Sequence, residues 1–216
     1  MTGLTAEMIL NAYMRGVFPM SEARDDPDLF WVDPELRGIF PLDDFHVPKR
    51  LAKTIRKMPF EVTIDTAFRR VMRECAADQE NRHTTWINQP ILDLYGELHD
   101  RGFAHSVECW QDGELAGGLY GVSFASVFCG ESMFTRVTDA SKVALVYLVA
   151  RLIHGGFTLL DAQFITDHLA RFGALEIARA DYHARLKLAL TVQGDFYSLP
   201  PDLGGLEILQ SITHTS

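Results

Sequence analysis

Hydrophobic and polar positions follow a helical spacing at the start of the chain and then lose any regular period. Residues 5–15 carry apolar side chains three and four positions apart, which predicts an amphipathic helix capped by Thr5 and ended by Gly16. Residues 17–48 are rich in proline, aspartate and aromatic residues, and they predict an irregular segment that packs on a neighbouring element. Residues 48–57 predict a short helix with proline at its first position.

From Phe60 onward the pattern alternates between strands and helices. The expected elements are a strand at 60–64, helices that start at Asp65 and Pro90, three strands between 103 and 130, a helix at 140–153, a strand at 157–164, a helix from Thr166 and a last helix at 179–190. Their order, β-α-α-β-β-β-α-β-α, predicts an α/β fold with a mixed sheet and helices on both faces. This order resembles the acyltransferase (GNAT-like) fold of N-acetyltransferases and of several enzymes that transfer amino acids from tRNA.

The composition suits one large domain with a small companion. The chain has 216 residues, of which 47% are hydrophobic and 23% charged. We expect a small N-terminal domain at residues 1–57 and a GNAT-like domain at residues 58–216. The net charge of −9 makes the whole molecule a poor binder of nucleic acid, because phosphate contacts require Lys and Arg. Any RNA must therefore bind to a local basic patch.

Cysteine usage and hydropathy predict a cytoplasmic protein. Cys75, Cys109 and Cys129 form no C-x-x-C pair, which argues against a disulfide scaffold and a zinc site. The N-terminus lacks the pattern of a secretory signal, and no apolar run approaches the roughly 20 residues that a membrane helix needs. The eight histidines show no metal-binding spacing, so we expect no metal.

The predicted helix at 48–57 concentrates positive charge in an acidic protein. Half of its positions are basic, namely Lys49, Arg50, Lys53, Arg56 and Lys57. A solvated helix face is the ordinary explanation of such charges. The functional alternative is a strip that binds phosphates.

Glu131 follows an apolar strand and precedes large apolar residues. A carboxylate in these surroundings costs free energy unless it has a partner. Backbone amides or Arg136 could satisfy it, or it could wait for a cationic ligand. The residues alone leave both alternatives open.

Asp161 and Gln163 lie two positions apart on the predicted strand at 157–164, so their side chains share one face. We expect Asp161 to accept a hydrogen bond from the side-chain amide of Gln163, which would leave the amide oxygen free to orient an attacking amine. The alternative is a polar strand end without a chemical role.

The turn before the helix at 140–153 reads T-D-A-S-K and contains no glycine run. In CoA-dependent acetyltransferases a glycine-rich turn at this place holds the pyrophosphate, so the sequence argues against CoA.

Short motifs in chain order, from about residue 8 to about residue 185, resemble the leucyl/phenylalanyl-tRNA–protein transferase family. They are A-Y-x-x-G-x-F-P-M (12–20), W-V-D-P (31–34), T-W-I (85–87), H-S-V-E-x-W (105–110), G-G-L-Y-G-V (117–122), F-C-G-E-S-M-F (128–134), A-S-K-x-A-L (140–145) and D-x-Q (161–163). The block at 128–134 is the most specific of them.

The resemblance implies site residues by position. Asp161 and Gln163 would be the catalytic pair, and Glu131 would lie near the basic terminus of the acceptor. The remaining substrate-binding positions would be Trp31 and Trp86, around the aminoacyl end of the donor, and Leu119, Phe128 and Met133, around its side chain. The chain departs from the usual pattern at Leu119, where many relatives carry Met, and at Ala162, where Cys is common.

The resemblance also implies an activity. Such an enzyme transfers leucine or phenylalanine from aminoacyl-tRNA to acceptor proteins with N-terminal Arg or Lys and so marks them for degradation. It uses no metal, CoA or other cofactor, and its basic helix would contact the tRNA; we expect a monomer that does not bind membranes. Two alternatives are a CoA-dependent N-acetyltransferase on the same fold and a non-catalytic binder of basic N-termini anchored by Glu131.

Overall fold

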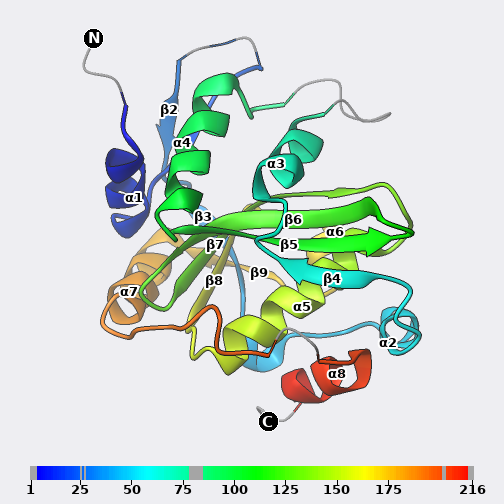
Figure 1. Ribbon diagram of the computed structural model, residues 1–216. Helices are drawn as coiled ribbons and strands as arrows, with labels where there is room; N and C mark the ends of the chain where they lie inside the picture. Colours follow the sequence, from blue (N-terminus) through cyan, green and yellow to red (C-terminus); the bar gives the residue numbers. More distant parts are fainter. Residues whose placement is uncertain (1–3, 25, 27, 78–84, 201–202, 214–216) are drawn as a thin grey trace.

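The computed structural model describes residues 4–24, 26, 28–77, 85–200 and 203–213, and its centre is a seven-stranded mixed sheet (Figure 1). The strands follow the spatial order β4 (Glu61–Ile64), β5 (Ala104–Gln111), β6 (Glu114–Phe124), β7 (Val127–Thr135), β8 (Leu159–Gln163), β3 (Leu36–Phe40) and β9 (Leu175–Ala178). Neighbouring strands pair antiparallel except β7 and β8, which are parallel. The expected mixed α/β fold is thus confirmed.

Helices cover both faces of this sheet (Figure 1). On one face lie α1 (Ala6–Met14), α3 (Phe68–Ala76) and α4 (Gln89–Asp100), whose apolar sides share a buried cluster with α7 (Arg179–Ala189). On the other face α5 (Ala140–His154) packs with α2 (Lys49–Arg56) and α8 (Gly205–Thr213). None of the described helices has both the length and the apolar character that crossing a membrane requires.

The parallel pair β7–β8 separates before either strand ends. Its last paired residues are Cys129 and Asp161, whereas β7 continues beside β6 as far as Thr135. Because β8 no longer fills the space beside the second half of β7, the sheet opens there. The helix α5 connects the two strands, as a parallel crossover requires.

The first part of the chain contributes strands both to a small separate sheet and to the main sheet. Strands β1 (Phe18–Met20) and β2 (Phe30–Val32) form a two-stranded sheet next to α1, and β3 lies between β8 and β9 in the main sheet. A short 3-10 turn, η1 (Leu42–Asp44), leads to α2. The proposed boundary between residues 57 and 58 stays a prediction; β3, on its N-terminal side, is hydrogen-bonded within the main sheet.

Most of the expected elements are present, with four corrections. The segment 17–48, expected to be irregular, contains β1, β2 and β3, and the weakly patterned tail contains α8. The strand β9 was not expected at all. Asp65 does not cap a helix: α3 begins at Phe68, and the Asp65 carboxylate accepts a 2.7 Å hydrogen bond from the Ser106 amide and lies 2.8 Å from His105. This carboxylate therefore connects β4 to β5.

Candidate active site

A cavity of about 270 Å³ lies where β7 and β8 separate. Its walls combine four polar residues of these strands with apolar residues of the sheet and of α5. The lining residues are Phe40, Leu119, Tyr120, Gly130, Glu131, Ser132, Met133, Leu145, Leu148, Leu160, Asp161, Ala162, Gln163, Thr166, His168 and Leu169. Both members of the expected catalytic pair thus lie at one cavity.

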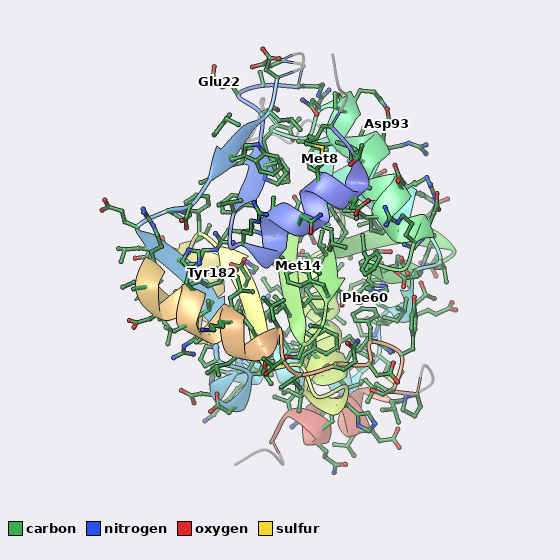
Figure 2. The ribbon with its side chains drawn as sticks, turned by 90° about the vertical axis from the view of Figure 1, so that its left-hand side faces the viewer. Met8, Met14, Glu22, Phe60, Asp93 and Tyr182 are labelled. Carbon is green, nitrogen blue, oxygen red and sulfur yellow. The ribbon has the colours of Figure 1, made fainter. Side chains whose placement is uncertain are left out.

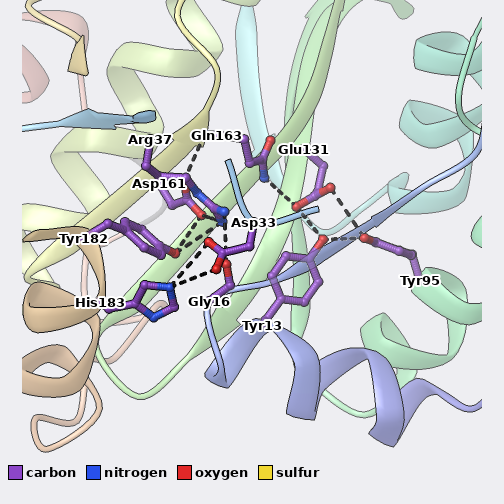
Figure 3. A network of polar contacts seen from close by, with 10 residues as sticks. All are labelled: Tyr13, Gly16, Asp33, Arg37, Tyr95, Glu131, Asp161, Gln163, Tyr182 and His183. Carbon is purple, nitrogen blue, oxygen red and sulfur yellow. Dashed lines mark hydrogen bonds and ion pairs between the residues drawn. The ribbon is translucent and has the colours of Figure 1, made fainter. Parts of the chain in front are cut away.

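Asp161 is completely buried and is held by Arg37 (Figure 3). Arg37 Nε donates to Oδ1 at 2.9 Å and Nη2 to Oδ2 at 2.5 Å, which is the bidentate geometry of a strong pair. Tyr182 Oη donates to Oδ2 at 2.9 Å. Burial alone would lower the pKa of Arg37, but the hydrogen bonds and the charge of Asp161 outweigh burial and raise it. Asp161 is therefore held in one place by Arg37 and Tyr182.

Gln163 ends β8 with a left-handed backbone, φ 57°. Such a conformation costs a non-glycine residue about 1–3 kcal/mol and is typical of functional sites. The Gln163 backbone amide donates to Asp161 Oδ1 at 2.8 Å, and its side-chain Nε2 donates to Glu131 Oε1 at 2.9 Å. The expected bond from this side-chain amide to Asp161 is wrong, because the left-handed turn brings the backbone N–H to Asp161 and directs the side chain to Glu131.

Glu131 occupies a bulge in β7. Tyr120 pairs with Ser132 and Gly121 with Gly130, so Glu131 has no partner in β6. A bulge of this kind redirects one side chain without ending the strand. The carboxylate of Glu131 consequently reaches the cavity wall.

Two tyrosines hold the Glu131 carboxylate from the helical layer (Figure 3). Tyr13 Oη of α1 donates to Oε1 at 2.7 Å, Tyr95 Oη of α4 donates to Oε2 at 3.4 Å, and the two hydroxyls also bond each other. Burial raises the pKa of Glu131 to about 7; the negative charge of Asp161 acts in the same direction, and the bond from Tyr13 opposes it. The partner proposed from sequence, Arg136, instead donates to Glu74 at 2.9 Å.

Four residues of this network were not predicted from the sequence: Arg37, Tyr13, Tyr95 and Tyr182. Tyr13 stands in one of the motifs, but its position on a predicted amphipathic face indicated only core packing. Arg37 lies in the segment without a period, where the rule that a buried carboxylate requires a cation could not identify which cation. The view of Figure 2 shows α1, which carries Tyr13, beside α7, which carries Tyr182.

The expected apolar pocket is partly present. Leu119 and Met133 line the cavity. Phe128 is not among the lining residues: it is fully buried and stacks on Phe196 with ring centroids 5.7 Å apart. Phe40, Leu145 and Leu148 contribute instead. Phe128 precedes the bulge, and its side chain belongs to the core around α5, so its expected role at the donor side chain stays a prediction.

The two tryptophans lie outside the wall of this cavity. Trp31, on β2, is 44% exposed, and Trp86 is partly buried before α4. Ser21 Oγ donates to the Trp86 carbonyl oxygen at 2.7 Å and so joins the segment after β1 to the start of α4. The binding role expected for both residues stays a prediction.

The basic helix is α2, and its two faces differ as expected. Leu51 and Ile55 are buried against α5 and α8. The basic side chains are all exposed: Lys49, Arg50, Lys53, Arg56 and, at the C-terminal end, Lys57. Their geometry is compatible with either the solvated face or the phosphate-binding strip.

The turn before α5 holds its own ion pair. Asp139 has a left-handed backbone, φ 72°, and its carboxylate lies 2.7 Å from Lys142 Nζ. Within the described ranges, His, Cys, Asp and Glu side chains form no cluster of three or more that could hold a metal ion.

Comparison with known proteins gives consistent matches over almost the whole chain. A family model described as "Leucyl/phenylalanyl-tRNA protein transferase" matches residues 39–187, and one for the N-terminal domain of the same family matches residues 3–35. The chain is 59% identical to the leucyl/phenylalanyl-tRNA--protein transferase of Phenylobacterium zucineum, with all of both chains covered. It is 57% identical to that of Caulobacter vibrioides, with 98% of each chain covered.

Among solved structures, the chain resembles that of L-PGS from Bacillus licheniformis at 14% identity and a TM-score of 0.39. The match covers 76% of this chain and 55% of the other.

Proposed function

Since the chain belongs to the leucyl/phenylalanyl-tRNA protein transferase family, we propose that it transfers leucine or phenylalanine from aminoacyl-tRNA to acceptor proteins with N-terminal Arg or Lys. The added residue marks the acceptor for degradation. We place the enzyme in the cytoplasm and expect it to act as a monomer. The proposal depends most on one observation, the hydrogen bond between Gln163 and Glu131 at the cavity.

This bond decides which atom of Gln163 is available for chemistry. Because Nε2 donates to Glu131, the amide oxygen on the other arm of the same group points away from Glu131. That oxygen is a pure acceptor, and it can take a hydrogen bond from the N–H of an incoming amine. The amine is thereby oriented toward the ester carbonyl of the donor, and such orientation lowers a barrier by several kcal/mol.

The transfer needs no further source of energy, because the aminoacyl ester of tRNA is already activated. The neutral α-amine of the acceptor attacks the ester carbonyl carbon. A C–N amide bond forms and the C–O bond to the ribose breaks. One proton leaves the amine and, in the net reaction, ends on the ribose oxygen as its hydroxyl hydrogen.

Asp161 acts through Gln163 in this mechanism. Both of its oxygens are occupied by Arg37, and one of them also holds the backbone N–H of Gln163. It therefore fixes the left-handed turn that presents the side chain of Gln163. This makes Asp161 a positioning residue whose loss should resemble the loss of Gln163.

Glu131 supplies the charge that favours a basic acceptor. In its ionised form the carboxylate can make a charge-assisted contact with the cationic N-terminal residue of the acceptor. Its partners within the fold, Tyr13, Tyr95 and Gln163, are all neutral donors, so the fold provides it with hydrogen bonds and leaves the counter-charge to the ligand.

The apolar part of the cavity suits the side chain of the donor. Leu119, Met133, Leu145 and Leu148 form a wall without charged groups. A pocket of this kind separates substrates that differ by a methylene by only about 1–3 kcal/mol. Both leucine and phenylalanine are therefore acceptable donors, and the tRNA body is held by the exposed charges of α2.

The transfer assay tests this proposal directly. The protein is incubated with labelled leucyl-tRNA and a peptide that begins with Arg, and the label is expected on the peptide. Gln163→Ala should reduce kcat/KM about 10²-fold, as expected when a reacting group loses its orientation. Gln193→Ala, in an exposed segment after α7, is the matched control.

The alternatives predict different results in the same experiment. A non-catalytic binder of basic N-termini would bind the Arg peptide without transferring label. A CoA-dependent acetyltransferase would be stabilised by acetyl-CoA and would leave leucyl-tRNA unchanged. Either result would overturn the proposal.

A further inference from the structure

A second pocket, of about 350 Å³, lies between α2, the beginning of α5 and the segment that contains α6 (Asp167–Ala170). Its polar wall is dominated by basic residues: Arg50 from α2, Lys142 from α5, and His168 and Arg171 from α6 and its end. Pro48, Leu51 and Phe172 add apolar surface. None of these residues is required by the chemistry proposed above.

The balance of charge in this pocket is positive. Asp139 is its acidic residue, and Lys142 lies within 2.7 Å of it, so these two charges cancel. Arg50 and Arg171 are both exposed, and in the part of the chain that the structure describes neither has an ion-pair partner. Two uncompensated guanidinium groups therefore face one small space.

The pKa of His168 reflects the same excess of positive charge. Burial lowers the pKa of His168, and the charges of Lys142 and Arg171 lower it further. Positive charges held together without a counter-ion repel one another, so an anion that enters the pocket relieves this repulsion.

The position of the pocket connects two parts of the site. His168 lines both this pocket and the catalytic cavity, whereas Arg50 lines the pocket and belongs to the basic face of α2. A polyanion that enters the catalytic cavity at one end and lies along α2 at the other must pass over Arg171 and Arg50.

We infer that this pocket, formed by Arg50, Lys142, His168 and Arg171, binds backbone phosphates of the single-stranded 3′ end of the donor tRNA. The inference rests on the proposed function and adds the path of the RNA to it. The aminoacyl group is esterified to the terminal ribose, so when that group occupies the cavity, the phosphates lie outside its mouth. Arg is well suited to them because its guanidinium group contacts phosphate oxygens in bidentate fashion.

The test compares two donors that carry the same ester. Leucyl-tRNA contains the backbone phosphates, and 3′-O-leucyl-adenosine lacks them. For each protein variant, kcat/KM for transfer to an Arg-initiated peptide is measured with both donors, and their ratio is taken. Arg171→Gln and Arg50→Gln remove one charge each from the pocket. Arg73→Gln, an exposed residue of α3 outside the pocket, is the matched control.

We expect the ratio of kcat/KM with leucyl-tRNA to kcat/KM with leucyl-adenosine to fall about tenfold in Arg171→Gln, because one charge-assisted contact to phosphate is lost. The same ratio should stay unchanged in Arg73→Gln. For the binding of uncharged tRNA, the slope of log K against log salt should decrease by roughly 0.7 for each lost contact. An unchanged ratio in Arg171→Gln, or an equal fall in Arg73→Gln, would overturn the inference and leave the proposed function intact. If the unsubstituted protein transfers from neither donor, the proposed function itself fails.

Discussion

At the scale of single residues, Asp161 and Arg37 form a buried pair whose members depend on each other. Both side chains are almost completely removed from solvent, at 0% and 1% exposure. Removing one partner of such a pair leaves an uncompensated charge and costs about 3–5 kcal/mol, whereas replacing both often costs much less. Stability and catalysis can therefore be separated at this site.

Arg37→Gln should lower the free energy of unfolding by about 3–5 kcal/mol and abolish most of the transfer. In the double variant Arg37→Gln, Asp161→Asn, no charge is left buried, so much of the stability should return. Transfer should stay low, because an amide in place of Asp161 holds the Gln163 backbone less firmly. Urea unfolding and the transfer assay measure the two effects. Full transfer by the double variant would contradict the role given to Asp161.

Glu131 is a residue whose charge state changes near neutral pH. The pKa of about 7 in the fold lies above the ordinary value of 4.5 that applies to the unfolded chain. Between these pH values the folded protein keeps a proton that the unfolded chain has released. The free energy of unfolding therefore decreases as the pH rises from about 4.5 to about 7, by an amount on the order of 3 kcal/mol, and is level above pH 7.

Glu131→Gln should remove this pH dependence, which thermal or urea unfolding across the range would reveal. The same titration should govern acceptor binding in the opposite direction. The affinity for an Arg-initiated peptide should increase as the pH rises through 7, because the carboxylate becomes charged. The affinity of Glu131→Gln for the same peptide should show no such increase. If the peptide affinities of the unsubstituted protein and of Glu131→Gln change with pH in parallel, Glu131 does not contact the acceptor.

At the scale of elements, α2 has two separable faces. Its buried residues fix it to α5 and α8, and its basic residues are free of that packing. Reversing Lys49 and Lys53 to Glu should raise the KM for leucyl-tRNA and flatten its dependence on salt, because fewer counterions are released. Reversal of Arg185 and Lys187, both exposed on α7, changes the net charge equally and is the control. If both reversals raise KM alike, α2 is only a solvated face.

The elements also show what the sequence could and could not predict. The region from Phe60 to Ala170 follows local hydrophobic periods, and its order of strands and helices was predicted correctly. Strand β3 was missed because both of its neighbours are distant in the chain: Ile39 pairs with Asp161 on one side and with Leu175 on the other. Its residues form a strand because of these partners and not because of a local alternation.

The same limitation applies to the site. The spacing of Asp161 and Gln163 brought both to one cavity, as predicted, but their mutual hydrogen bond depends on the left-handed backbone of Gln163. A bulge placed Glu131 at the wall of that cavity and left Phe128 in the core. Neither a single left-handed residue nor a bulge has a reliable signature in one sequence, so these contacts could not be predicted from local patterns.

At the scale of the whole molecule, the site is assembled from segments that are distant in the chain. Tyr13 comes from the first helix, Arg37 from β3, Glu131 from β7 and Asp161 from β8. The first two precede Phe60, where the alternation of strands and helices begins. The N-terminal segment therefore contributes side chains to the polar network of the site as well as to the fold.

Tyr13→Phe tests this contribution without disturbing α1. The hydrogen bond from Tyr13 lowers the pKa of Glu131, so its removal should raise that pKa further above 7. The midpoint of acceptor binding should then move to higher pH, and stability should fall by about 1 kcal/mol, as for one lost buried hydrogen bond. Peptide titration at several pH values measures the midpoint. A midpoint that stays in place would remove Tyr13 from the site.

The bond from Tyr13 to Glu131 has a consequence for how this enzyme can be recombined with its relatives. In a chimera that takes its first helix from another member, the residue at the place of Tyr13 would set the pKa of Glu131, although every strand of the main sheet would be unchanged. Exchange of this segment with a homologue that lacks a tyrosine at this place should thus shift the working pH before it alters the choice of amino acid.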